Sequence, residues 1–127
     1  MDVNKLSNQV IGIAIEVHKA LGPGLLESAY EECLCHELAL KKLDFKRQEP
    51  LPVAYKGINL DCGYRLDIEV EDKLILELKA CHMIEPIHRA QLLTYLKLSN
   101  RQLGLLFNFN VVSMRQGIVR IVNGFQE

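Results

Sequence analysis

The sequence predicts one α/β (α+β) domain in which helices flank a mixed β-sheet, with the element order ααβββαβ(β). Three observations support this fold class. Apolar residues recur every three or four positions in two N-terminal segments, they alternate with polar residues in a central pair of segments, and a third helical segment precedes a short apolar run. The 127 residues are expected to form a single domain, 1–127, because this length leaves no room for two independent cores.

The first predicted element is a helix over residues 3–21. Its apolar residues lie three or four positions apart, so one face of the helix is expected to be buried. Gly22-Pro23-Gly24 then ends this helix and begins the next one, because glycine favours the turn and proline favours a helix start. The expected buried face comprises Val3, Leu6, Val10, Ile13, Ala14, Val17 and Leu21.

The second predicted helix runs to about Lys42. Glu27 lies at the edge of its apolar face, and Tyr30 on that face is interpreted as a core residue. Glu37 falls in the middle of the face, where fraying of the helix or pairing with a basic residue would explain it. The apolar face comprises Leu25, Leu26, Ala29, Tyr30, Cys33 and Leu34.

Residues 45–55 are predicted to form an extended strand. Pro50 and Pro52 have no backbone N–H to donate, so they confine part of this strand to a sheet edge or to an irregular stretch. Gly57 marks the turn that follows.

Strands over residues 60–70 and 73–80 are predicted to pair as a hairpin. A two-residue turn would mix polar with apolar side chains on both faces of the sheet. A three-residue connection over 71–73 keeps one apolar face whole, and that register is therefore predicted. The apolar face would comprise Leu66, Ile68, Val70, Leu74, Leu76 and Leu78. The opposite pairs would be Asp67 with Glu77, Arg65 with Lys79 and Leu66 with Leu78.

This register brings Asp67, Glu77 and Lys79 to one side of the sheet. Two carboxylates about 4 Å apart repel by about 4 kcal/mol at an effective dielectric constant of about 20, so a positive charge is expected between them. A hard divalent cation such as Mg²⁺ prefers these oxygen ligands, and Lys79 is the other available positive charge. The alternative is a solvated hairpin on which Lys79 pairs with either carboxylate.

A third helix is predicted over residues 86–98, beginning at Pro86. A short apolar strand over 103–109, of the kind that is buried on both faces, follows it. A final strand is predicted over 118–122. The core positions of the third helix are Ala90, Leu92, Leu93 and Leu96.

The composition is that of a globular protein with almost no excess charge, since the formal net charge is −1. Proteins that bind nucleic acid through many phosphate contacts usually carry a basic excess, so the charge argues mildly against tight DNA binding. One local group of basic residues is interpreted either as a basic patch or as a solvated turn. It comprises Lys41, Lys42, Lys46 and Arg47.

No basic start followed by an apolar run is present, and no apolar stretch reaches the roughly 20 residues of a membrane helix. We therefore expect a cytoplasmic protein that does not associate with membranes. The four cysteines form no CxxC pair, so reduced and mostly buried thiols are expected rather than disulfides or a zinc site.

Three short motifs carry the functional signal. Asp67 is followed on the next predicted strand by Glu77-Leu78-Lys79, Gln91 and Tyr95 lie four residues apart on a predicted helix, and residues 24–30 read Gly-Leu-Leu-Glu-Ser-Ala-Tyr. The first motif resembles the D…(D/E)xK signature of the PD-(D/E)XK nuclease superfamily, and the second resembles the QxxxY motif of its exonuclease-type branch. The third resembles the motif of the GxxExxY protein family. The resemblance spans nearly the whole chain and implies a restriction-endonuclease-like core.

The resemblance also implies a metal-dependent active site. Asp67 and Glu77 would bind Mg²⁺ (or Mn²⁺), and the backbone carbonyl of Leu78 would be a further ligand. Glu27 would complete the acidic cluster or hold a metal-bound water. Lys79 would orient the attacking water or stabilise charge that develops on the phosphate. The residues expected to contact substrate or to support the site are Arg65, His88, Gln91 and Tyr95.

The resulting hypothesis is a Mg²⁺-dependent nuclease that hydrolyses phosphodiester bonds in DNA or RNA. The alternative is a non-catalytic, nuclease-like protein with a binding or regulatory role in nucleic-acid metabolism. Because the chain has no net positive charge, such an enzyme would act on short or single-stranded ends, or would gain affinity through a homodimer or a protein partner.

Overall fold

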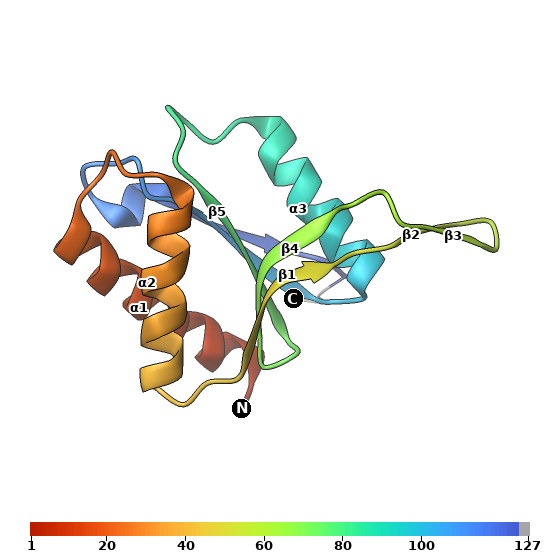
Figure 1. The fold of residues 1–127 in the computed structure, drawn as a ribbon, viewed down its shortest axis with the longest axis horizontal. Helices are drawn as coiled ribbons and strands as arrows, with labels where there is room; N and C mark the ends of the chain where they lie inside the picture. The colour runs from red at the N-terminus through yellow and green to blue at the C-terminus, as the bar shows by residue number, and fades with distance from the viewer. Residues whose placement is uncertain (125–127) are drawn as a thin grey trace.

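A mixed sheet with helices on both faces forms the body of the molecule (Figure 1). The computed structural model describes residues 1–124. This architecture confirms the predicted fold class. The elements in chain order are α1 (Val3–Leu21), α2 (Glu27–Leu40), β1 (Phe45–Pro50), β2 (Val53–Tyr55), β3 (Ile58–Leu60), β4 (Arg65–Val70), β5 (Leu74–Lys79), α3 (Pro86–Ser99), β6 (Leu103–Asn108), the 3-10 helix η1 (Met114–Gly117) and β7 (Ile118–Val122).

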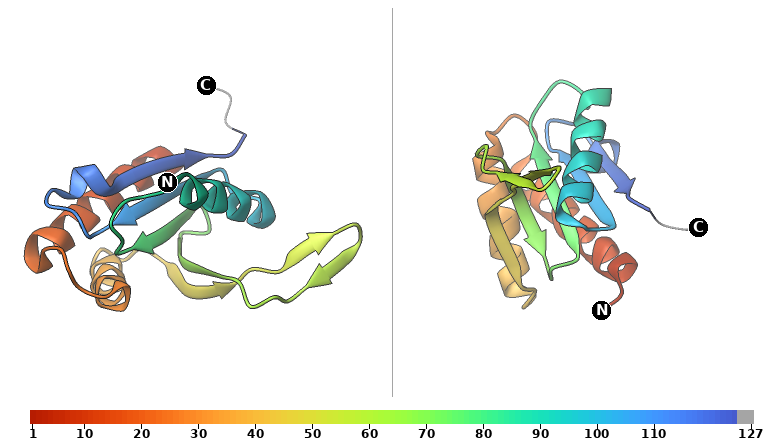
Figure 2. Two further views of the ribbon diagram at one scale, coloured as in Figure 1. Left: turned by 90° about the horizontal axis from the view of Figure 1, so that it is seen from above. Right: turned by 90° about the vertical axis from the view of Figure 1, so that its right-hand side faces the viewer.

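The main sheet has five strands in the order β1-β4-β5-β6-β7. β5 and β6 are parallel, and the other neighbouring strands are antiparallel. A parallel pair needs a crossover connection, and α3 provides it between β5 and β6. β2 and β3 form a separate two-stranded sheet that projects from the body as an arm (Figure 2).

Two clusters of buried side chains cover the two faces of the main sheet. The larger cluster joins α1 and α2 to one face, and the smaller cluster joins α3 to the other. All of β6 is buried as a result, which confirms the prediction for this strand. Gly104 of β6 lies so close to α3 that a Cβ atom there would meet the side chain of Leu92 at 3.0 Å.

The β4–β5 hairpin has the predicted three-residue connection. Val70 pairs with Leu74 and Ile68 pairs with Leu76, so residues 71–73 lie outside the ladder. Glu71 and Asp72 adopt left-handed conformations, each with φ of 55°, and these close the turn. The ladder ends at Ile68–Leu76, so the predicted pairs Asp67–Glu77, Leu66–Leu78 and Arg65–Lys79 lie beyond it.

The start of α2 differs from the prediction. Leu25 and Leu26 lie before the helix and are 41% and 77% exposed, so they are not part of its buried face. The cause is the loop after α1, where Gly22 and Gly24 both have positive φ. The Tyr30 hydroxyl fastens this loop by donating to the Gly22 carbonyl (2.6 Å) and accepting from the Leu25 N–H (3.1 Å). Tyr30 is fully buried and stacks on Phe109, as expected of a core residue.

The strand predicted over 60–70 is divided in two. β3 pairs with β2 in the arm, whereas β4 pairs with β1 and β5 in the main sheet. Residues 61–64 separate them, and the side chain of Asp61 accepts a hydrogen bond from the N–H of Gly63, whose φ is +80°. Such a local turn competes with a continuous strand. Ala90, predicted as a core position of α3, is exposed.

None of the described helices is both long and apolar enough to cross a membrane. The four cysteines are free thiols, as predicted, but only Cys35 is buried, and Cys62 is exposed.

Candidate active site

The candidate site begins where β4 and β5 stop pairing. Ile68–Leu76 is the last regular pair, and carboxylates replace the ladder beyond it. The N–H of Leu78 donates to Asp67 Oδ2 at 2.8 Å, and the N–H of Asp67 donates to Glu77 Oε1 at 3.3 Å. Each acidic side chain is thereby fixed by the backbone of the opposite strand. The predicted contact between Asp67 and Glu77 is therefore present.

The edge strand β1 is irregular at the same level. Gln48 has a φ of +50° and lies between the pairs Arg47–Ile68 and Glu49–Leu66, opposite Asp67. A left-handed conformation at a residue of this type costs about 1–3 kcal/mol, and such strain often occurs at functional sites. The alternation of faces changes here as well. Leu66 packs with α3, whereas Ile68 faces α1 and α2, so the predicted single apolar face of β4 is wrong at Leu66.

Glu77 is buried without a cation of its own. Its side chain is 5% exposed and forms no ion pair with another described residue. Burial and then the adjacent charge of Asp67 raise the pKa of Glu77 to about 9, and the positive charge of Lys79 opposes this shift. In the absence of a bound cation, Glu77 is therefore protonated at neutral pH, and the pair carries at most one negative charge.

A small cavity opens on the α2 side of this pair. Its volume is about 210 Å³. Glu27, exposed in the first turn of α2, borders this cavity together with Asp67. Glu31 also borders it and is held by Arg47 (2.8 Å) and by the amide of Gln48 (2.8 Å). The cavity is lined by Glu27, Ser28, Glu31, Gln48, Asp67 and Leu78.

Tyr95 borders the pair from the α3 side. It is 9% exposed, and its ring centroid lies 6.2 Å from that of Tyr64. Burial, followed by the charges of Glu77, Tyr64 and Asp67, raises the pKa of Tyr95. Gln91 lies one turn earlier on α3, is exposed, and forms no hydrogen bond with another described residue.

Two other predicted site residues have local contacts. His88 Nδ1 accepts a hydrogen bond from the N–H of Glu85 at 2.9 Å and caps the start of α3. Arg65 is exposed and donates to the carbonyl of Tyr64 at 2.9 Å. Neither contact reaches the acidic pair.

The segment after Lys79 is held by hydrogen bonds to the buried side-chain amide of Asn108. Asn108 is 2% exposed, accepts from the N–H of Cys81 (3.2 Å) and donates to the carbonyl of Cys81 (3.0 Å). The carbonyl of Lys79 accepts from the N–H of Phe109 (3.0 Å). Asn108 thus holds the end of β5 in place. The sequence analysis missed Asn108, Gln48, Ser28 and Glu31. An asparagine within an otherwise apolar strand was a usable signal for the first of these.

The basic group near β1 does not form a free patch. Lys46 pairs with Asp72 at 3.1 Å, and Arg47 pairs with Glu31 and Glu32 at 2.8 and 2.9 Å. Two of these four positive charges are therefore neutralised within the protein, whereas Lys41 and Lys42 are exposed and form no ion pair with another described residue.

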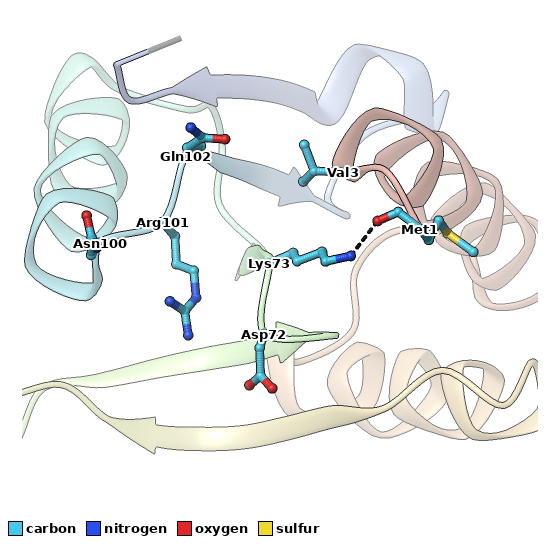
Figure 3. Close-up of a pocket in the computed structure, with 7 residues that line it drawn as sticks. All are labelled: Met1, Val3, Asp72, Lys73, Asn100, Arg101 and Gln102. Atoms are coloured by element: carbon cyan, nitrogen blue, oxygen red, sulfur yellow. Dashed lines mark hydrogen bonds between the residues drawn. The ribbon is translucent and has the colours of Figure 1, made fainter.

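A larger cavity, of about 460 Å³, lies at the other end of β5 (Figure 3). It contains no predicted site residue, and Lys73 crosses it to donate to the carbonyl of Met1. This cavity is larger than the one beside Asp67, but it contains no pair of acidic side chains, so the acidic pair remains the candidate site. It is lined by Met1, Val3, Asp72, Lys73, Asn100, Arg101 and Gln102.

The acidic pair suits a hard divalent cation that keeps much of its water. Within residues 1–124, no group of three or more His, Cys, Asp or Glu side chains is arranged to hold a metal ion. Glu27 borders the cavity without joining such a group. Mg²⁺ usually takes one or two protein carboxylates and several waters, so Asp67 and Glu77 match its needs. The raised pKa of Glu77 fits a position that a bound cation would stabilise in its ionised form.

The chain matches a known protein family. The family described as the PD-(D/E)XK nuclease superfamily matches residues 4–121. PD-(D/E)XK nucleases usually use divalent metal ions and act on nucleic acid. No curated protein and no solved structure matches the chain significantly.

Proposed function

Since the chain belongs to the PD-(D/E)XK nuclease superfamily, we propose that it is a metal-dependent nuclease that hydrolyses phosphodiester bonds in DNA or RNA. The observation that carries this proposal is the juxtaposition of Asp67 and Glu77, two acidic side chains of which neither forms an ion pair with another described residue. The motif Gly24…Glu27…Tyr30 further supports membership of the GxxExxY group. Free thiols are typical of cytoplasmic proteins, and we propose that this protein is cytoplasmic.

Asp67 and Glu77 would hold Mg²⁺ or Mn²⁺, with the carbonyl of Leu78 as a further ligand. A bound divalent cation would supply Lewis-acid chemistry, by lowering the pKa of a water and by polarising the phosphoryl group. The backbone N–H of Leu78 keeps Asp67 directed at this position. Glu27, across the small cavity, would accept a hydrogen bond from a water and hold it for attack.

Lys79 would carry positive charge next to the reacting phosphate. It lies two residues after Glu77 on β5, so the two side chains share a face of the strand. A fixed cation there would stabilise the charge that develops on the phosphate oxygens or orient the attacking water. Asn108 would position Lys79 through the Cys81 segment. Gln91 and Tyr95 would contact substrate from α3, with Arg65 and His88 at greater distance from the pair.

A second function has one specific observation in its favour. Lys46 and Arg47 are paired with acidic side chains, so the basic group near β1 offers less charge for phosphate contacts. A nuclease-like protein that binds a metal or a phosphorylated ligand without cleaving nucleic acid would fit this charge distribution. A partner that supplies nucleic-acid affinity would also fit it.

The test is cleavage of labelled single- and double-stranded DNA and RNA in the presence of Mg²⁺ or Mn²⁺. We expect wild type to cleave at least one substrate, and Asp67→Ala and Lys79→Ala to abolish cleavage. Asp72→Ala, on the same hairpin but exposed, is the matched control and should retain activity. Equal cleavage by all four proteins would indicate contamination and exclude the proposed site. Absence of cleavage with Mn²⁺ still bound would favour the second function.

A further inference from the structure

The β2–β3 arm carries one apolar face that the rest of the chain does not cover. Val53 pairs with Leu60 and Tyr55 pairs with Ile58, and residues directly opposite each other share a face. Tyr55, Ile58 and Leu60 are 58%, 53% and 42% exposed. Figure 2 shows the arm extending away from the body. A two-stranded hairpin without a packing partner is marginally stable in water, so this face is suited to contact another molecule.

A groove between α1 and α2 has the complementary character. Its volume is about 310 Å³, and its surface is mostly apolar. Glu37 lies at this groove, half-buried, and its side chain forms no ion pair or hydrogen bond with another described residue. The charge of Glu37 is therefore not balanced by an ion pair within the described residues. The groove is lined by Glu16, Val17, Ala20, Leu21, Glu32, Cys33, His36 and Glu37.

We propose that the arm of one molecule docks in the α1–α2 groove of a second copy of this chain, and that the exchange is reciprocal. Tyr55 and Ile58 would enter the apolar groove. Lys56, whose Nζ lies 5.4 Å from the centroid of the Tyr55 ring, would reach Glu37 at its edge. The occupant thus supplies both an aromatic anchor and the cation that the groove lacks.

The positions of the two surfaces allow a closed dimer. The arm and the α1–α2 pair lie at opposite ends of the long axis of the molecule (Figure 1). Two molecules placed side by side and related by a two-fold axis would each bring an arm to the other's groove, and the assembly would not extend further. Tyr55 and Lys56 could also contact nucleic acid, but the rest of this face is aliphatic, and Val53, Ile58 and Leu60 favour a protein surface. This inference does not depend on the nuclease activity.

Analytical ultracentrifugation of the full chain over a range of concentrations tests the dimer. We expect a reversible dimer whose dissociation constant rises by about 30-fold or more in Tyr55→Ser, as for loss of a central aromatic anchor. Asn59→Ser changes the other face of the arm and should leave the dissociation constant unchanged. A protein that remains monomeric at all concentrations, or a dimer that Tyr55→Ser does not weaken, would overturn the proposal. The proposal would also be overturned if the protein is a monomer and Tyr55→Ser lowers its affinity for oligonucleotides, because the arm would then bind nucleic acid.

Charge reversal tests the groove as the site of docking. Lys56→Glu and Glu37→Lys should each weaken the dimer, and the double variant should recover most of the wild-type affinity. Recovery would also exclude misfolding of Glu37→Lys as the cause. A dimer that loses affinity in Tyr55→Ser but is indifferent to Glu37→Lys would show that the arms contact each other, and would refute docking in the groove.

Cross-linking identifies the contact directly. Cys33 lines the groove, so Ile58→Cys in a Cys62→Ser, Cys81→Ser background should form a disulfide-linked dimer with diamide as the oxidant. The linked dimer should disappear when Cys33→Ser is added. If it persists in that variant, the arm does not reach the groove.

Discussion

Glu69 and Glu77 lie in the same hairpin, on the same side of the sheet, and are 4% and 5% exposed. Their partners differ. Glu69 Oε2 accepts from Arg101 Nε at 2.9 Å, whereas Glu77 Oε1 accepts from the backbone N–H of Asp67 at 3.3 Å and lies beside the Asp67 side chain, whose charge raises the pKa of Glu77. The same residue type, at the same burial, is thus neutralised in one place and left without a counter-ion in the other.

This difference distinguishes an acid whose charge is balanced within the fold from one that, under the proposed function, would bind a metal ion. A buried carboxylate is costly unless it is paired, and Arg101 meets that need for Glu69. Nothing within the described chain meets it for Glu77, whose pKa rises to about 9. A strongly perturbed acid beside a second acid is typical of functional sites. The comparison predicts opposite responses of the two glutamates to the same substitution.

The largest expected effect is on cleavage. Glu77→Gln keeps the size of the side chain and an oxygen for the Asp67 N–H, but it removes the charge that would bind a cation. We expect nuclease activity with Mn²⁺ to fall by about 10²–10³-fold. Glu69→Gln should change the rate by less than about threefold, measured as initial rates on the preferred substrate. Similar losses in both variants would remove the distinction between the two acids.

The next effect concerns stability against pH in the presence of EDTA. The unfolded chain releases the Glu77 proton near the ordinary pKa of 4.5, whereas the folded chain holds it until about pH 9. The free energy of unfolding should therefore fall as pH rises between these values, by up to about 1.4 kcal/mol per pH unit from this group. Urea denaturation at pH 6, 7.5 and 9 measures the slope.

Glu77→Gln should flatten this slope and stabilise the protein at pH 8 when no metal is present. Mn²⁺ should raise the melting temperature of wild type more at pH 8 than at pH 6, because binding displaces a proton from Glu77. If wild type and Glu77→Gln have the same pH dependence, Glu77 does not hold its proton in the folded state.

Glu69→Gln should change the free energy of unfolding by a smaller amount than Glu77→Gln, and in the opposite direction. This change leaves Arg101, which is 29% exposed, without its carboxylate. Partial exposure of Arg101 limits the penalty, so we expect a loss of about 1–3 kcal/mol in the free energy of unfolding. Urea denaturation at pH 7.5 checks it. A stabilised Glu69→Gln would mean that the ion pair does not compensate its own burial.

The smallest change in stability and cleavage is expected for Asp72→Asn, which serves as a reference for the other variants. The pair Lys46–Asp72 is solvent-exposed, with side chains 53% and 68% accessible. Asp72→Asn should cause no measurable shift in the urea midpoint and no change in cleavage, because exposed ion pairs contribute little. A clear loss in this variant would show that the hairpin responds to any change of charge.

The hairpin register was predictable because it depends on pairwise alternation. Only a three-residue connection places Asp67 opposite Glu77, and the pairs Ile68–Leu76 and Val70–Leu74 confirm it. The same alternation failed at Leu66, which packs with α3. The reason is the left-handed Gln48 on the neighbouring strand, and glutamine carries no sequence signal for that conformation.

The arm was not predictable for a related reason. Residues 60–70 read as one strand, since alternation does not show which neighbour a strand pairs with. The turn at Asp61 and Gly63 divides it. Leu25 and Leu26 were misplaced because helical spacing continues through a loop that the Tyr30 hydroxyl fixes from a distance in sequence. Contacts that the local sequence pattern does not reveal determine both the division of residues 60–70 and the start of α2.

The left-handed conformation of Gln48 also affects how readily the edge of the sheet can aggregate. β1 is an edge strand, and a long regular edge offers a template on which foreign strands can add. Gln48 interrupts its regular backbone, and Pro50 and Pro52 have no N–H to donate to an incoming strand. The irregularity that lies opposite Asp67 therefore also protects the sheet from aggregation along its open side.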